Sequence, residues 1–181
     1  MKSSLRSLIL AAEFAAVIAV LSQLTIPIGI IPLTGQTFAI GLTVTILGRK
    51  TGTYAIIVYL LLGLIGLPVF AGMKGGFGVL FGPTGGYLVG FVLNGLLTGY
   101  ILEKTTFNYT WGNIANLAGA IVTLIFGTVW LKFSGDLNWA AAFTSGFTPF
   151  ILPGIIKAVA AAYCGILIRK RFDKQLSALI S

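Results

Sequence analysis

Long apolar runs, separated by short breaks rich in glycine and proline, restrict the fold of this 181-residue chain more than any other feature. A helix needs about 20 predominantly apolar residues to cross a bilayer, and several of the runs approach that length. Only 9% of the residues are charged and 57% are hydrophobic, whereas a soluble domain carries about 25% charged residues. The chain is therefore expected to be an all-α integral membrane protein, with one transmembrane domain covering residues 1–181.

The apolar runs predict six transmembrane helices. Their limits follow from prolines and glycines, which interrupt helices, and from charges, which are rare inside a bilayer. The expected helices cover about residues 8–26, 37–47, 54–67, 87–102, 114–133 and 150–168. The second run has eleven residues, which at about 1.5 Å each span only half of a typical ~30 Å core. This helix is expected to be short or to gain length from the preceding loop.

The basic residues predict the orientation of these helices. With both termini in the cytoplasm, nine lysines and arginines lie on the inner side and two in outer loops, as the positive-inside rule requires. The inner residues are Lys2, Arg6, Arg49, Lys50, Lys104, Arg169, Lys170, Arg171 and Lys174, and the outer ones are Lys74 and Lys132. An odd number of helices would put one basic terminus outside. Topology thus explains the net charge of +8, and no nucleic-acid binding is expected.

The inventory of reactive side chains argues against several activities. There is no histidine and Cys164 is the single cysteine, which excludes disulfides and Cys/His metal sites. The four acidic residues form no His/Asp or paired-acid pattern, as a membrane-embedded enzyme acting on lipids would need. No glycine-rich segment matches Walker A, so ATP hydrolysis by this chain is not expected. We therefore expect neither an enzyme nor a cofactor-binding protein.

Lys157 is the most informative single residue because it falls inside the last predicted helix. An ammonium group in the middle of a transmembrane helix costs at least ~2.5 kcal/mol on insertion scales, so it is expected to face a cavity or a ligand. The alternative is a lysine that reaches the outer membrane interface, since Lys157 lies only four residues after Pro153.

Asn94 and Gln36 are amides in or beside apolar runs. Asn94 fits a hydrogen bond between helices, whereas Gln36 follows a break and could point into a site.

Two loops on the predicted outer side have unusual compositions. Residues 26–36 are apolar but broken by prolines and glycines, which fits a hydrophobic lid. Residues 66–88 are rich in glycine, which lets a backbone approach a ligand closely; tight helix packing or a plain turn is the alternative. The aromatic residues Phe70, Phe77, Phe81 and Tyr87 accompany this loop, either as an interfacial belt or as the wall of a pocket for a flat ring.

The first predicted helix carries small residues in overlapping Ala-x-x-x-Ala steps, which allow another helix to approach closely. These residues are Ala11, Ala12, Ala15, Ala16 and Ala19. Packing within the chain and docking onto a partner protein are equally compatible with this pattern.

Three segments together resemble the BioY family over nearly the whole chain. They are PLTGQTF, which contains Gln36, GLPVFAGMKGGFGVLFGPTGGYLVGF from Gly66 onward, and the element from Pro153 to Lys157. Members of this family are biotin-binding S components of energy-coupling-factor (ECF) transporters. The resemblance implies a six-helix S-component fold in the cell membrane, with a biotin pocket near the outer surface closed by the loop between the first two helices. It also implies a transmembrane coupling subunit and two cytoplasmic ATPase subunits as partners.

The resemblance also implies which residues act. The substrate-binding candidates are Gln36, Phe70, Gly85, Gly86, Tyr87, Asn94 and Lys157. The candidates for contact with the coupling subunit are Ala12 with Ala16, or Ala11 with Ala15. The family often places an acidic residue one turn before the lysine, where this chain has Gly154. We expect Lys157 to donate to the carboxylate or the ureido oxygen of biotin. The competing expectation is a self-sufficient carrier or channel, in which the alanine-rich face would pack homo-oligomers.

Overall fold

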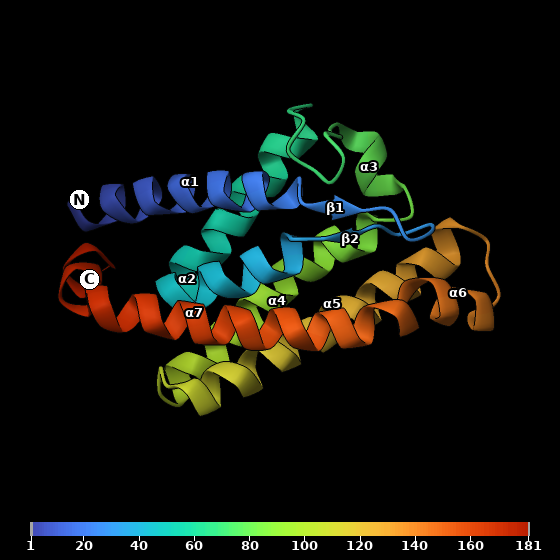
Figure 1. Ribbon diagram of the computed structural model, residues 1–181. Helices are drawn as coiled ribbons and strands as arrows, with labels where there is room; N and C mark the ends of the chain where they lie inside the picture. Colours follow the sequence, from blue (N-terminus) through green and yellow to red (C-terminus); the bar gives the residue numbers. More distant parts are fainter. Residues whose placement is uncertain (1, 181) are drawn as a thin grey trace.

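The computed structural model describes residues 2–180 of the chain, and the side chains of residues 5–171 (Figure 1). The protein is a bundle of helices with one short antiparallel pair of strands, so the expectation of a helical fold is confirmed. The elements are α1 (Lys2–Ser22), β1 (Thr25–Ile26), β2 (Leu33–Thr34), α2 (Gln36–Leu64), α3 (Phe77–Phe81), α4 (Gly85–Lys104), α5 (Tyr109–Ser134), α6 (Trp139–Gly146) and α7 (Thr148–Ile180).

Four helical segments in the described part of the chain are long and apolar enough to cross a membrane. They are Leu5–Ser22, Gly85–Lys104, Tyr109–Ser134 and Trp139–Arg171. The predicted helices at 37–47 and 54–67 are instead the two arms of α2. The count of six crossings and the cytoplasmic position of both termini therefore stay predictions.

A break at Gly48 divides α2 into these arms. Its φ of 80° and ψ of −179° lie in a region that glycine adopts without steric cost, and Figure 1 shows the arms running in different directions. The backbone N–H of Arg49 donates to Glu103 Oε1 of α4 over 2.9 Å, and the side chains of this pair approach to 3.3 Å. The turn between the arms is thus tied to the end of α4.

The two ends of the bundle differ. Both termini lie at one end, and the β1–β2 hairpin lies at the other, as Figure 1 shows. We call these the terminal end and the hairpin end. The hairpin pairs Thr25 with Thr34 and Ile26 with Leu33, so the predicted apolar lid is a short hairpin that connects α1 to α2. Of the basic residues used to predict orientation, the side chains of Lys2 and Lys174 lie outside the described ones.

Helix capping explains two boundaries that hydrophobicity alone misplaces. Helix α5 begins at Tyr109, before the predicted residue 114, because the Asn108 side chain accepts a hydrogen bond from the N–H of Trp111 over 2.9 Å. Helix α6, which the sequence analysis does not predict, begins after Asn138, whose side chain accepts from the N–H of Ala141 over 2.8 Å. Helix α7 then continues through Pro153, so this proline does not end a helix.

Candidate functional site

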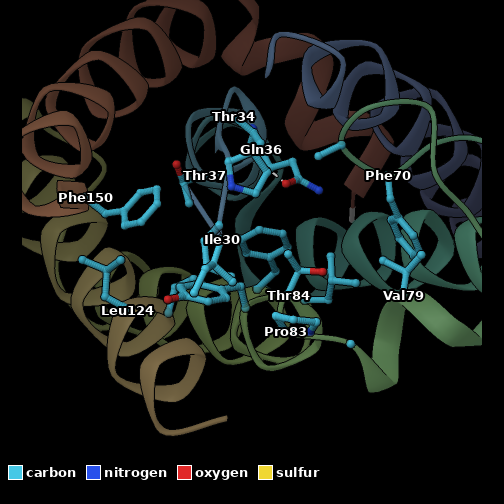
Figure 2. Close-up of a pocket in the computed structure, with 18 of the residues that line it drawn as sticks. Ile30, Thr34, Gln36, Thr37, Phe70, Val79, Pro83, Thr84, Leu124 and Phe150 are labelled. Atoms are coloured by element: carbon cyan, nitrogen blue, oxygen red, sulfur yellow. Dashed lines mark hydrogen bonds between the residues drawn. The ribbon is translucent and has the colours of Figure 1, made fainter. Parts of the chain in front are cut away.

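A cavity of about 340 Å³ opens at the hairpin end, within the ~300–1,000 Å³ range usual for small-molecule sites. Its wall combines segments that are far apart in the sequence: the hairpin, the start of α2, the loop around α3, and parts of α4, α5 and α7 (Figure 2). Most of the wall is apolar. Its polar side chains are Thr34, Gln36, Thr37, Lys74, Thr84, Thr123 and Lys157, and its aromatic ones are Phe70, Tyr87, Phe91 and Phe150.

The charge of this wall has one sign. Lys74 and Lys157 line the cavity, and none of the lining residues is acidic. The described residues also contain no group of three metal-ligating side chains. An occupant that carries a negative charge would therefore meet the Lys157 ammonium and no repulsive carboxylate, with the exposed Lys74 at the wall as a second cation. The cavity is built to receive a largely apolar molecule with an anionic group.

Lys157 joins α7 to the hairpin. Its Nζ donates to the backbone oxygen of Thr34 in β2 over 2.8 Å, and the side chain is half-buried in the cavity wall. The ammonium group is therefore turned toward the hairpin at the cavity wall. An ammonium has three N–H donors and this bond uses one of them, so Lys157 can hold the hairpin and still donate to a ligand.

Gln36, the first residue of α2, lies in the wall but its amide is largely engaged. Its Nε2 donates to the hydroxyl of Tyr59 over 2.7 Å, and its Oε1 accepts from the hydroxyl of Thr34 over 2.9 Å. Figure 2 shows Thr34 and Gln36 together above the cavity. Gln36 thus connects strand β2 to the second arm of α2, and one amide hydrogen remains for a ligand.

The predicted aromatic residues separate into two groups. Phe70 is 1% exposed and packs edge-on against Tyr59 with ring centroids 5.6 Å apart, and Tyr87 donates its hydroxyl to the Gly146 oxygen over 2.6 Å. Both line the cavity. Phe77 and Phe81 are 64% and 68% exposed, as expected of side chains at a membrane interface. The pocket-wall alternative therefore fits the first two residues and the belt alternative fits the last two.

The structure does not bring Gly85 and Gly86 to the cavity wall. A Cβ on Gly85 would lie 1.6 Å from the Leu80 oxygen, and one on Gly86 would lie 2.1 Å from the Cβ of Trp130. These glycines permit close packing at the start of α4, which is the packing alternative for this segment. The residues just before them, Gly82, Pro83 and Thr84, line the cavity instead.

Asn94 is the third candidate that lies away from the wall. Its Nδ2 donates to the Thr123 hydroxyl over 3.2 Å, and its Oδ1 accepts from the Thr98 hydroxyl over 3.0 Å. Asn94 is 2% exposed and both ends of its amide are used, one toward Thr123 of α5 and one within α4. Its bonds hold Thr123, which does line the cavity, so its contact with the site is indirect.

Sequence reasoning missed most of the polar and aromatic wall residues, Lys74 among them, and two of the others are informative. Thr37 is next to Gln36, and its hydroxyl oxygen is buried with no hydrogen-bond partner among the described residues. Phe150, at the start of the last predicted helix, packs 6.4 Å from the Tyr87 ring. An unpaired buried hydroxyl cannot be seen in a sequence, because it depends on which groups the fold brings near it.

Four of the alanines of α1 lie on two adjacent faces of the helix, one buried and one exposed. Ala11 and Ala15 are 0% exposed, and Ala15 belongs to the apolar core shared with α2 and α4. Ala12 and Ala16 are exposed. The buried pair serves packing within the chain, so the pair available to a partner protein is Ala12 and Ala16.

Comparisons with known proteins agree on one family. The BioY family model matches residues 1–174. The chain is 46% identical over 164 residues to the biotin transporter BioY2 of Lactococcus lactis subsp. cremoris, covering 91% of this chain and 90% of that one. It is 41% identical to the biotin transporter BioY of Thermotoga maritima, covering 92% and 97%. A crystal structure at 2.1 Å of the S component for biotin from an ECF-type ABC transporter superposes with a TM-score of 0.85 at 32% identity, covering 92% of both chains.

Proposed function

The chain belongs to the BioY family, and we propose that it is the substrate-capture subunit of an ECF-type importer, binding biotin in the cavity at the hairpin end. The family consists of transporter components and not of enzymes. In this proposal the protein crosses the cell membrane six times with both termini in the cytoplasm, and the hairpin end faces outward. Transport is driven by partners: a transmembrane coupling subunit and two cytoplasmic ATPase subunits.

The observation that carries the proposal is the cavity with two lysines, no acidic residue and mostly apolar walls. Biotin combines a polar ureido group, an apolar ring and chain, and one carboxylate. A site for it needs apolar walls and a few well-placed donors. Lys157 supplies a charged donor to the carboxylate or to the ureido oxygen, and the rings of Phe70 and Tyr87 supply flat apolar wall.

Lys157 also gives the hairpin a role. Because its ammonium already holds the Thr34 oxygen over 2.8 Å, a ligand bound to Lys157 lies next to the hairpin strand. Gln36 keeps that strand in place through the Thr34 hydroxyl. In this proposal the hairpin closes over the ligand, with Lys157 bonded to both.

The proposed contact with the coupling subunit uses the exposed face of α1. Ala12 and Ala16 are one turn apart and exposed, so a partner helix can approach the α1 backbone there. Ala12→Leu with Ala16→Leu would obstruct this approach without touching the buried Ala11 and Ala15. The double variant is expected to bind biotin normally and to lose co-purification with the coupling subunit.

The direct test is titration of the purified, detergent-solubilised protein with biotin, desthiobiotin, thiamine and riboflavin. Tight binding of biotin, below micromolar concentrations, is expected. If another vitamin bound in that range and biotin did not, the assignment of biotin as the substrate would be wrong. Biotin uptake in cells that lack coupling ATPases distinguishes this proposal from a self-sufficient carrier. A capture subunit binds biotin in such cells without sustained accumulation, whereas a self-sufficient carrier would accumulate it.

A variant tests the part played by the lysine. Lys157→Ala removes the charged donor and is expected to weaken biotin binding tenfold or more, in line with the loss of a charge-assisted hydrogen bond. Lys132→Ala is the matched control, since Lys132 lies over the rings of Phe133 and Trp139 outside the cavity. If folded Lys157→Ala protein bound biotin with wild-type affinity, Lys157 would not be a donor to the ligand.

A further inference from the structure

A second hollow lies away from the cavity, along one side of α4. It is an open groove of about 400 Å³ lined by Arg49, Leu93, Leu96, Leu97, Tyr100 and Val122. None of these residues lines the cavity. The groove follows the second half of α4 toward the terminal end of the bundle, where α4 ends at Lys104.

The floor of the groove is apolar and exposed. Leu93, Leu96 and Leu97 are three and four residues apart, which places them on one face of α4. Leu96 is 44% exposed, and this helix is among those long and apolar enough to cross a membrane. A hydrocarbon chain can lie along this face without displacing any side chain of the bundle.

Cations gather where the groove ends. The Arg49 guanidinium lies 5.8 Å from the centroid of the Tyr100 ring, and the Lys104 ammonium lies 6.0 Å from it. Lys50 follows Arg49 and is exposed. Glu103 is the one carboxylate that pairs with any of them among the described side chains, and its partner is Arg49 at 3.3 Å. Three cations against one anion leave an excess of positive charge beside the ring.

Arg49 is held in a fixed position at this point. The Gly48 break directs it toward α4, and a Cβ on Gly99 would lie 2.3 Å from the Arg49 Cα, so only glycine lets the two backbones approach. Glu103 binds the backbone N–H of Arg49 at 2.9 Å and its Nε at 3.3 Å. The terminal Nη atoms make no hydrogen bond to the described residues, and this planar pair of donors matches the geometry of a phosphate.

We propose that this groove binds an anionic glycerophospholipid, with one acyl chain along Leu93, Leu96 and Leu97 and the phosphate at Arg49 and Lys104. Charge complementarity and the apolar floor together favour a lipid over a soluble anion, which would use only the basic end. They also favour it over a helix of a partner protein, for which the cations would be left without a counter-charge. Basic pockets between transmembrane helices are a recognised means of holding anionic headgroups.

The test is native mass spectrometry of the full-length protein in a neutral detergent, titrated with phosphatidylglycerol or with phosphatidylcholine of identical chains. One phosphatidylglycerol is expected to bind at least tenfold more tightly than phosphatidylcholine. Lys104→Gln is expected to weaken this binding about fivefold, the loss expected for one lysine near anionic lipid. Leu96→Trp keeps every charge but fills the groove, and should weaken binding of both lipids.

Lys132→Gln is the matched control, because that lysine also lies near aromatic rings but at the far end of α5. It should leave lipid binding unchanged. Equal binding of the two lipids, or unchanged binding in both Lys104→Gln and Leu96→Trp, would refute the proposal. Competition by soluble glycerol 3-phosphate at similar concentrations would replace it with a site for a free anion.

Discussion

Two regions of the molecule place polar side chains among apolar ones, and they treat them differently. In the α4–α5 seam, which we define as Asn94, Thr98 and Thr123, each side chain has hydrogen-bond partners within the protein. In the cavity wall, the Thr37 hydroxyl has no partner among the described residues, and Lys157 donates to a single backbone oxygen. The two regions meet at Thr123, which belongs to both.

The difference teaches how to separate structural polar groups from binding ones. A buried polar group without a partner costs about 1–3 kcal/mol. Among the described residues, unpaired buried oxygens also occur away from the cavity wall, at Thr43, Thr53, Asn113 and Thr128. An unpaired oxygen therefore indicates a ligand contact only where it also lines the cavity. The glycines divide in the same way. Gly86, where α4 packs against α5, has no room for a methyl group, whereas Gly154 in the cavity wall has no atom within 4 Å of an added Cβ.

The largest expected effect comes from Gly86→Ala. The new methyl group would lie 2.1 Å from the Cβ of Trp130 and 2.9 Å from the Phe126 oxygen, so α4 must move away from α5. We expect the free energy of unfolding in detergent to fall by about 3 kcal/mol, at the upper end for overpacking. Gly154→Ala is the matched control: its added Cβ meets no atom, so no loss is expected, and the helix preference of alanine should raise the free energy of unfolding by up to about 1 kcal/mol. Equal losses in the two variants would remove the distinction between the regions.

Asn94→Leu is expected to have the next largest effect. It removes both amide bonds of the seam, one to Thr123 of α5 and one from Thr98 within α4, and leaves a side chain of similar size. A hydrogen bond between membrane helices contributes up to about 1.7 kcal/mol. The free energy of unfolding should fall by about 1–2 kcal/mol. Biotin affinity of the folded protein should change less than threefold, since Asn94 does not line the cavity. A tenfold loss of affinity with unchanged stability would return Asn94 to the site.

The sequence could predict the residues whose chemistry is costly in a bilayer. Lys157 and Gln36 stood out because a charge or an amide there needs a partner, and both lie in the cavity wall. The helical class followed from apolar runs, and the family followed from three motifs. Gly85 and Gly86 could not be separated from Gly82 and Thr84, because glycine permits close approach without stating whether a ligand or Trp130 approaches.

The sequence also could not predict which face of α1 is buried. Ala11 and Ala12 are neighbours with identical side chains, and which of them is buried depends on where α2 lies. Position in the bundle also determines how the two arms of α2 are oriented. Its two arms were predicted as separate helices, and only the Gly48 conformation shows how the chain turns between them. Tertiary contacts, which local pattern does not contain, settle both cases.

Gln36→Leu tests the residue that has features of both regions. Its amide is bonded to Thr34 and Tyr59, like the seam, but it lines the cavity. We expect a loss of about 1 kcal/mol in the free energy of unfolding and about fivefold weaker biotin binding, since the hairpin strand loses its tie to α2. Thermal unfolding and titration on the same preparation measure both. An effect on one quantity alone would assign Gln36 to one region.

Thr37→Val is the smallest change and the sharpest one, because it removes a hydroxyl that has no partner in the protein. If that hydroxyl is reserved for the ligand, biotin binding should weaken about threefold while the free energy of unfolding stays constant or rises, since an unpaired buried oxygen is removed. Thr123→Val is its counterpart: its hydroxyl bonds the Gly119 oxygen over 3.0 Å and accepts from Asn94, so the same substitution should lower stability. Were Thr37→Val to destabilise the protein as much as Thr123→Val does, the cavity hydroxyl would be structural. The rule that an unpaired wall group marks a ligand contact would then fail for this protein.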